Sequence, residues 1–318
     1  SFTYGGAAGI EHILGFHRRH GTTRMVASHS AAPLDDLRAG LMSVADVIEA
    51  GATGLIGSHL EGPFLAESHC GAQDIRHFAA PDRNVLSSLL RAGRGTVRMM
   101  TLAPELSGAD ELIADLRDAG VVAAFGHTDA TYEEVMAAIV AGATVSTHLF
   151  NGMRKFHHRD PGAVGAALDH PGVICEVIGD LLHVHPAVVR SLFALKGDAG
   201  VALVTDATQM AGLADGAYQW GDRVVTVRGG TAVVDGSLAG STATMIESVR
   251  NLVAAGIPLA DVIRSASTTP AQAIGLAADI GEIEPGMRAD LVVLDRDLGV
   301  VAVIVDGRVS HGPPSWIR

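Results

Sequence analysis

The sequence predicts an α/β protein built on a (β/α)₈ barrel of the TIM type. Short runs of β-branched and apolar residues alternate with helical patterns as far as Asp206. Polar residues recur at the ends of those runs. The length of 318 residues also suits one large barrel. Strict alternation of strand and helix implies right-handed βαβ units, and therefore a parallel sheet.

Seven strands are expected in this part of the chain. Each is a short run of apolar and β-branched residues. The expected strands cover residues 24–28, 54–60, 96–102, 121–127, 144–149, 173–178 and 201–205. Apolar residues three and four apart predict helices between them, for example over 110–119, 131–141 and 186–196. Thr131 opens the sequence TYEE, which is typical of a capping box at a helix start.

The pattern changes after Asp206. Residues 224–236 predict a β-hairpin that turns at Gly229-Gly230, and two helices are expected over 242–255 and 259–267. The tail reads as short strands over 281–310. We therefore assign residues 1–280 to the barrel and 281–318 to part of a small accessory β domain.

Composition limits the possible partners and location. A formal net charge of -12 disfavours non-specific nucleic-acid binding, and no run of apolar residues is long enough to span a membrane. The chain has only two cysteines, Cys70 and Cys175, which fits a reducing cytoplasm better than a secreted, disulfide-built domain. We expect a cytoplasmic protein without a nucleic-acid or membrane partner.

Four strand ends carry polar residues that suit a metal site. Glu61 lies in HLEGP, His127 in FGHTDAT, His148 in THLFNGM and Asp206 in VTDATQM. One such residue alone would more often be a hydrogen-bonded polar group or a helix cap. In a (β/α)₈ barrel, however, the carboxyl ends of the strands meet at one mouth, where active sites lie. Two His, one Glu and one Asp there predict a catalytic metal site with an open position for water.

These motifs resemble the amidohydrolase superfamily and, within it, the deacetylase family that acts on N-acetylglucosamine 6-phosphate. The resemblance covers nearly the whole chain and is carried by seven motifs. They are HLEGPFL (59–65), FGHTDATY (125–132), THLFNGM (147–153), RDPG (159–162), GDLLHV (179–184), VTDA (204–207) and LAGSTATM (238–245). HLEGP and THLFNGM together are the most specific; the tail GEIEPGMRADLVVLD is typical of many amidohydrolases.

The resemblance implies a site and a reaction. Glu61, His127 and His148 would hold a divalent metal, most simply zinc, with iron, manganese or cobalt as alternatives. Asp206 would be the general base in hydrolysis of the acetamide of N-acetylglucosamine 6-phosphate, which yields glucosamine 6-phosphate and acetate. The substrate would contact several further residues, and part of the site would come from the second subunit of a homodimer. Those residues are Gln73, Asn151, Gly152, Arg159, His183 and Leu238.

The chain departs from the family pattern in two places. Family members carry a His-x-His pair at the end of the first barrel strand, and this chain opens at SFTYGG without that pair; the first strand of the barrel is therefore expected to be missing. In the loop AESHCGAQ the family often has a His where this chain has Gln73, which would still donate a hydrogen bond to the acetyl carbonyl; His69 is an alternative donor. We also consider His69 and Cys70 as part of a mobile lid.

Two other functions remain open at this point. A dihydroorotase- or hydantoinase-like amidohydrolase would carry a bridging carboxylated Lys, yet the run TVRMMTLAPE has no Lys. A non-catalytic sugar-phosphate-binding barrel would have lost its metal, but such a protein has no need of the base Asp206.

Overall fold

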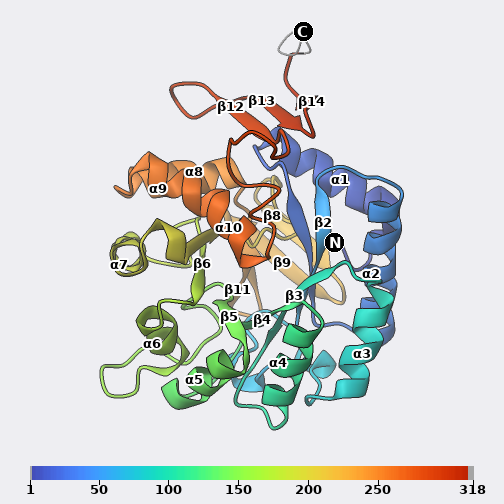
Figure 1. The fold of residues 1–318 in the computed structure, drawn as a ribbon, viewed down its shortest axis with the longest axis vertical. Coiled ribbons are helices and arrows are strands. Elements are labelled where there is room, and N and C mark those ends of the chain that lie inside the picture. Colours follow the sequence, from blue (N-terminus) through green and yellow to red (C-terminus); the bar gives the residue numbers. More distant parts are fainter. Residues whose placement is uncertain (1, 314–318) are drawn as a thin grey trace.

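The computed structural model describes residues 2–313 and places seven parallel strands side by side in chain order. The strands are β1 (Met25–Ser30), β2 (Leu55–Glu61), β3 (Val97–Leu102), β4 (Val122–Phe125), β5 (Ala143–Ser146), β6 (Ile174–Ile178) and β7 (Val201–Val204). Figure 1 shows this sheet curled at the centre of the molecule with helices outside it. The prediction of a parallel, TIM-type barrel sheet is therefore confirmed, and each of the seven expected strands is present.

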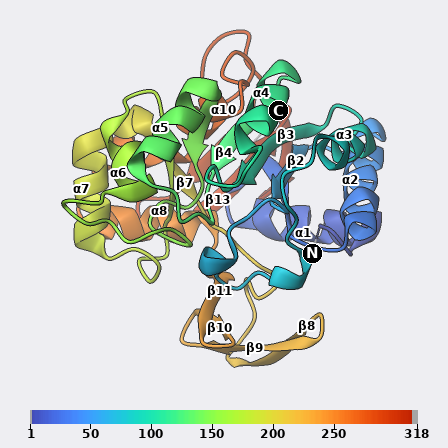
Figure 2. The same ribbon diagram turned by 90° about the horizontal axis from the view of Figure 1, so that it is seen from below.

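Helices follow the strands and cover the outer face of the sheet (Figures 1 and 2). They are α1 (Gly6–Arg19), α2 (Leu34–Glu49), α3 (Arg83–Ala92), α4 (Ala109–Asp118), α5 (Tyr132–Ala141), α6 (Gly162–Asp169), α7 (Pro186–Lys196), α8 (Met245–Ala254), α9 (Leu259–Ala266) and α10 (Thr268–Ala273). Short 3₁₀ turns are η1 (Glu67–His69), η2 (Ile75–His77) and η3 (Asp198–Gly200). The expected capping box begins α5: the Thr131 hydroxyl accepts from the Glu134 amide, and the Glu134 carboxylate accepts from the Thr131 amide. No helix within residues 2–313 is both long enough and apolar enough to cross a bilayer.

Apolar residues between sheet and helices form the main core. Leu60, Phe64, Met100, Leu102 and Phe125 are all fully buried there. Burying a side chain of this size contributes about 1.5–3 kcal/mol relative to leaving it in water. This rigid layer fixes the strand ends, and with them the polar residues that follow.

A second sheet interrupts the barrel after β7. Its strands are β8 (Gly216–Trp220), β9 (Arg223–Arg228), β10 (Thr231–Val234) and β11 (Ser237–Ser241), in the order β11-β10-β9-β8. The predicted hairpin over 224–236 is β9 and β10, which turn at Gly229-Gly230 with positive φ angles of 57° and 78°. The sequence reading missed β8 and β11, which are short strands, and β8 has no fully buried residue. Figure 2 shows this sheet projecting from the barrel.

The tail forms a three-stranded antiparallel sheet of β12 (Leu291–Leu294), β13 (Val300–Val305) and β14 (Arg308–His311). The expectation of strands over 281–290 is wrong, because that stretch consists of bends, one turn and irregular backbone. Arg24, just before β1, holds the small sheet through ion pairs with Asp290 and Asp306. The domain boundary at residue 280 stays a prediction, and residues 314–318 lie outside the described part of the chain.

The barrel wall is open between β1 and β7. Among residues 2–313 no strand pairs with the outer edge of either, and a cavity of about 1010 Å³ lies there, lined by residues from both, such as Val26 and Leu203. An eighth strand, expected from the sequence pattern to come first, is not among the described residues.

Candidate active site

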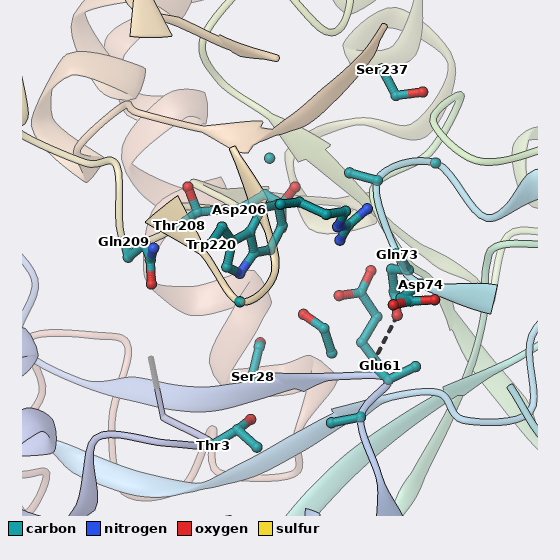
Figure 3. A pocket seen from close by; sticks show the side chains of 18 of the residues that line it. Thr3, Ser28, Glu61, Gln73, Asp74, Asp206, Thr208, Gln209, Trp220 and Ser237 are labelled. Carbon is teal, nitrogen blue, oxygen red and sulfur yellow. Dashed lines mark hydrogen bonds between the residues drawn. The ribbon is translucent and has the colours of Figure 1, made fainter. Parts of the chain in front are cut away.

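The four predicted strand-end residues meet in one pocket at the carboxyl ends of the strands. Glu61, His127, His148 and Asp206 all line this cavity of about 1040 Å³. Figure 3 shows Glu61 and Asp206 among the residues that surround it. The prediction that these four side chains converge therefore agrees with the geometry of the barrel mouth.

Glu61, His127 and His148 form a cluster suited to one metal ion. The Nε2 atoms of His127 and His148 lie 2.8 Å and 2.9 Å from the same Oε1 atom of Glu61. Their ligand atoms lie within 4.8 Å of one another, and all three side chains are at least 88% shielded from solvent. Two imidazoles and one carboxylate are the donor set of many catalytic zinc sites.

The contacts behind His127 fix which nitrogen faces the cluster. Its Nδ1 lies 2.8 Å from the carbonyl oxygen of His69, which can only accept a hydrogen bond. Nδ1 therefore carries the proton, and the lone pair of a neutral His127 points from Nε2 at the carboxylate of Glu61. Two lone pairs at this distance repel unless a proton or a metal cation lies with them, so the residues present fit a metal.

Three residues of the site share an unusual backbone conformation. His127, His148 and Asp206 have φ angles of 47°, 30° and 48°, in the left-handed region that residues with a Cβ seldom adopt. Each such residue costs roughly 1–3 kcal/mol, and such strain gathers at functional sites. All three stand two residues beyond the last residue of a strand, where a left-handed turn redirects the side chain into the mouth.

The charges of the site depend on one another. Although burial opposes ionisation, the imidazoles of His127 and His148 hold the pKa of Glu61 well below its usual range when their Nε2 atoms carry protons. Burial also opposes the charged imidazole of His148, but Glu61 outweighs it and raises the pKa of His148 to about 9. Burial and the nearby charge of Glu61 raise the pKa of Asp206 to about 6. A carboxyl group with such a pKa is suited to accept and return a proton near neutral pH.

Five of the six predicted substrate residues lie at the same pocket. Asn151, Gly152, His183, Leu238 and Gln73 all line it. The Gln73 side chain accepts from the Ala31 amide at 2.9 Å through Oε1, which leaves its NH₂ group facing His127 Nε2 at 3.3 Å. Gln73 is therefore placed as a hydrogen-bond donor next to the metal cluster.

The structure places three predicted residues away from the pocket. Arg159 is exposed in the loop after β5, where it contacts the His158 side chain. The His69 side chain turns to Asp129 at 3.0 Å, so its expected role as a substitute donor for Gln73 does not fit this geometry. Cys70 is half-buried beside it and does not line the cavity either. A lid role for this loop stays a prediction.

The sequence reading missed one wall of the pocket. Gln209, Trp220 and Arg223 line it from the segment between β7 and β11. Figure 3 shows Gln209 and Trp220. The Arg223 guanidinium lies 5.3 Å from the centre of the Trp220 ring. On the other side, Arg76 pairs with Asp74 and, at 2.9 Å, with Asp222 of the β8–β9 turn. Trp220 ends β8 and Arg223 begins β9, so a tryptophan and an arginine on either side of a short turn were the available sequence signal. The position of this sheet over the mouth is a tertiary feature.

A second missed residue is Glu176 on β6. It is half-buried and lines the cavity between β1 and β7. Loss of contact with water raises the pKa of Glu176 to about 7. One of its oxygens accepts a hydrogen bond from the main-chain amide of His148 at 3.2 Å. In the sequence it stands inside the apolar run VICEVI, where an isolated acid was the available signal.

A parallel barrel sheet with a His-His-Glu cluster at its strand ends defines the class of metal-dependent barrel hydrolases. The family model described as "Amidohydrolase family" matches residues 5–310. The chain belongs to this family and, within it, to the group that contains the N-acetylglucosamine-6-phosphate deacetylases named below.

Relatives and solved structures agree on this group. One solved structure is a variant of the Mycobacterium smegmatis N-acetyl-D-glucosamine-6-phosphate deacetylase in complex with N-acetyl-D-glucosamine-6-phosphate. It is 42% identical in sequence and superposes with a TM-score of 0.93. The match covers 98% of this chain and 82% of the Mycobacterium chain. The Bacillus subtilis N-acetylglucosamine-6-phosphate deacetylase is 38% identical over 80% of this chain and 65% of its own length. An Escherichia coli O157:H7 N-acetylgalactosamine-6-phosphate deacetylase is 36% identical over 93% of this chain and 80% of its own length. The chain thus spans just under two thirds of the Bacillus relative.

Proposed function

We propose that the protein hydrolyses the acetamide of N-acetylglucosamine 6-phosphate to glucosamine 6-phosphate and acetate, within amino-sugar breakdown. The observation that carries the proposal is the placement of Glu61, His127 and His148 around one point of the pocket that Asp206 also lines. The relatives named above support the choice of substrate. We place the reaction in the cytoplasm, with which the two free thiols agree.

The residues divide the chemistry between them. Glu61, His127 and His148 would hold a divalent metal, most simply zinc, which when bound supplies a Lewis acid that lowers the pKa of water from ~15.7 towards ~7. Asp206 takes a proton from the water as its oxygen adds to the acetyl carbonyl carbon. When the bond from carbon to nitrogen breaks, Asp206 returns that proton to the leaving amine.

Gln73 and the pocket walls would orient the substrate. The NH₂ group of Gln73 is positioned to donate to the acetyl oxygen, where negative charge develops. Asn151, Gly152 and His183 would face the sugar phosphate, and the His183 ring is held by Asp180 at 2.6 Å. Since the chain is acidic overall, a local group of donors is what an anionic substrate requires.

We further propose that Arg159 contacts the phosphate of a substrate bound in the neighbouring subunit. The guanidinium suits bidentate contact with phosphate oxygens, yet it lies outside the pocket of its own chain. A homodimer that places this loop at the partner's pocket would use the residue. We therefore propose that the protein is a homodimer.

The deciding experiment measures acetate release by the purified chain, loaded with zinc, from three sugars. These are N-acetylglucosamine 6-phosphate, N-acetylgalactosamine 6-phosphate and unphosphorylated N-acetylglucosamine. We expect the first to react with the highest kcat/KM and the last to react poorly. Faster release from the galactose epimer would change the assigned hexosamine, and binding without any acetate release would favour a non-catalytic sugar-phosphate barrel.

A further inference from the structure

The two histidines of the metal cluster are held in different ways. The His127 ring is fixed from behind, because its Nδ1 donates to the carbonyl oxygen of His69 at 2.8 Å. The Nδ1 atom of His148 is buried and has no hydrogen-bond partner among residues 2–313. The direction of the His148 ring must therefore come from its backbone and from packing.

That backbone is strained at His148. Its φ angle of 30° takes the residue out of the parallel ladder of hydrogen bonds. The amides on either side remain in regular bonds: Thr147 donates to the carbonyl oxygen of Phe125, and Leu149 donates to that of Glu176. Among residues 2–313, no carbonyl oxygen accepts from the His148 amide. A buried amide in that position is costly unless another acceptor meets it.

The Glu176 side chain is that acceptor. Its Oε2 atom receives the His148 amide at 3.2 Å, while its own main-chain oxygen receives the Leu149 amide at 2.8 Å. One residue of β6 thus holds both amides of the turn that carries the metal ligand. The carboxylate stands outside the metal cluster of Glu61, His127 and His148.

We infer that Glu176 is a positioning residue for the metal site: its side-chain oxygen holds the left-handed turn at His148 and so aims Nε2 of His148 at the ion. The inference rests on the metal site of the proposed function. Outer-sphere partners of metal-bound histidines usually act on the imidazole ring, and their loss typically weakens metal binding by about 10–100-fold. Glu176 performs this task through the main chain.

The test compares three variants of the full chain. Glu176→Gln keeps a side-chain oxygen that accepts the amide, whereas Glu176→Met has a similar size and no such acceptor. Val177→Ala is the matched control, since it removes buried apolar atoms at the next position of β6, whose side chain points to the opposite face of the sheet from that of Glu176. Zinc affinity is measured by competition with a chromophoric chelator, and the geometry of the site by the d–d absorption of the cobalt-substituted protein.

We expect Glu176→Met to weaken zinc binding by about 10–100-fold and to change the cobalt spectrum. Glu176→Gln and Val177→Ala should stay within about threefold of the unaltered chain, although Val177→Ala lowers the melting temperature. Zinc binding by Glu176→Met within that range would overturn the inference. So would equal weakening in Val177→Ala and Glu176→Met, which would indicate general destabilisation.

The Gln variant keeps the inference testable even where the Met variant does not fold. A folded Glu176→Gln protein with tenfold weaker zinc binding would show that charge, rather than the hydrogen bond, matters at this position, and would overturn the inference by itself. Failure of the unaltered chain to bind zinc at all would instead count against the proposed function. The two failures are therefore distinguishable.

Discussion

The rings of His127 and His148 stand nearly perpendicular, at 87°, with their centres 4.9 Å apart. Each points Nε2 at the same oxygen of Glu61. Ligands that approach one point from different directions are what a compact, tetrahedral ion such as zinc requires. The carboxylate of Glu61 is therefore the group that both imidazoles share.

Glu61→Gln should weaken zinc binding by more than the roughly 10–100-fold that is typical of losing an outer-sphere partner. The change keeps the shape and removes the only anionic ligand of the cluster. A chelator competition assay gives the affinity. Glu105→Gln is a matched control, since that carboxylate bonds to Thr128 and Asp129 at the same mouth. Equal zinc affinity in Glu61→Gln and the unaltered chain would refute the ligand assignment.

Asp206→Asn should leave zinc content unchanged and lower kcat by at least ~10²-fold, the scale for loss of a general base. Asn keeps the size of the side chain but cannot take up the proton. Metal analysis and acetate release are measured on the same sample. Turnover close to that of the unaltered chain, with zinc in place, would mean that another group moves the proton.

Arg159→Ala should lower kcat/KM for the phosphorylated sugar and have little effect on the unphosphorylated one, because the residue is assigned to the phosphate. Mixing Arg159→Ala subunits with Asp206→Asn subunits should restore activity, since one site of each mixed dimer then has both residues intact. A chain that carries both substitutions, mixed with itself, is the control. No restoration after verified subunit exchange would exclude a contribution from the partner.

Asp306, between β13 and β14, should make the stability of the folded chain depend on pH. Burial opposes ionisation, but hydrogen bonds from Arg24 and Arg288 hold the pKa of Asp306 below its usual range. A lowered pKa stabilises the folded chain at pH above the unfolded value of about 3.9, and this contribution is lost as pH falls through the folded value. Asp306→Asn should therefore cost about 1–3 kcal/mol at neutral pH and progressively less below about pH 4.

Urea unfolding at several pH values measures this effect. Asp297→Asn, which changes an exposed carboxylate of the same segment, should leave stability nearly unchanged. An effect of Asp306→Asn that does not vary with pH would show that the ion pair with Arg24 is not its cause.

Cys70 should react more slowly with a thiol reagent when a substrate analogue is bound. Cys70 precedes Gly71, which lines the pocket and lies so close to His127 that an added Cβ would sit 3.4 Å from its ring. Cys175 is completely buried and serves as the internal control that should not react. Labelling at the same rate with and without the analogue, together with unchanged kinetics of Cys70→Ser, would leave Cys70 as an ordinary loop residue.

The sequence by itself determined the parallel barrel sheet and the cluster at its mouth. Strand runs were short, apolar and regularly spaced, and parallel strands bring their carboxyl ends together whatever the details of packing. Glu61, His127, His148 and Asp206 could therefore be brought together from their positions at strand ends alone. The short capping box at Thr131 was readable for the same reason, because its contacts span three residues.

Only the tertiary structure decided the contacts that depend on side-chain direction or on distant segments. His69 lies near the cluster in the sequence reading, but its ring turns to Asp129 and its carbonyl oxygen orients His127. The wall that holds Trp220 depends on how an inserted sheet folds back over the mouth. Glu176 meets the His148 amide across 28 residues, because a left-handed turn frees that amide from the ladder. Such a contact is set by backbone geometry, which no local residue pattern encodes.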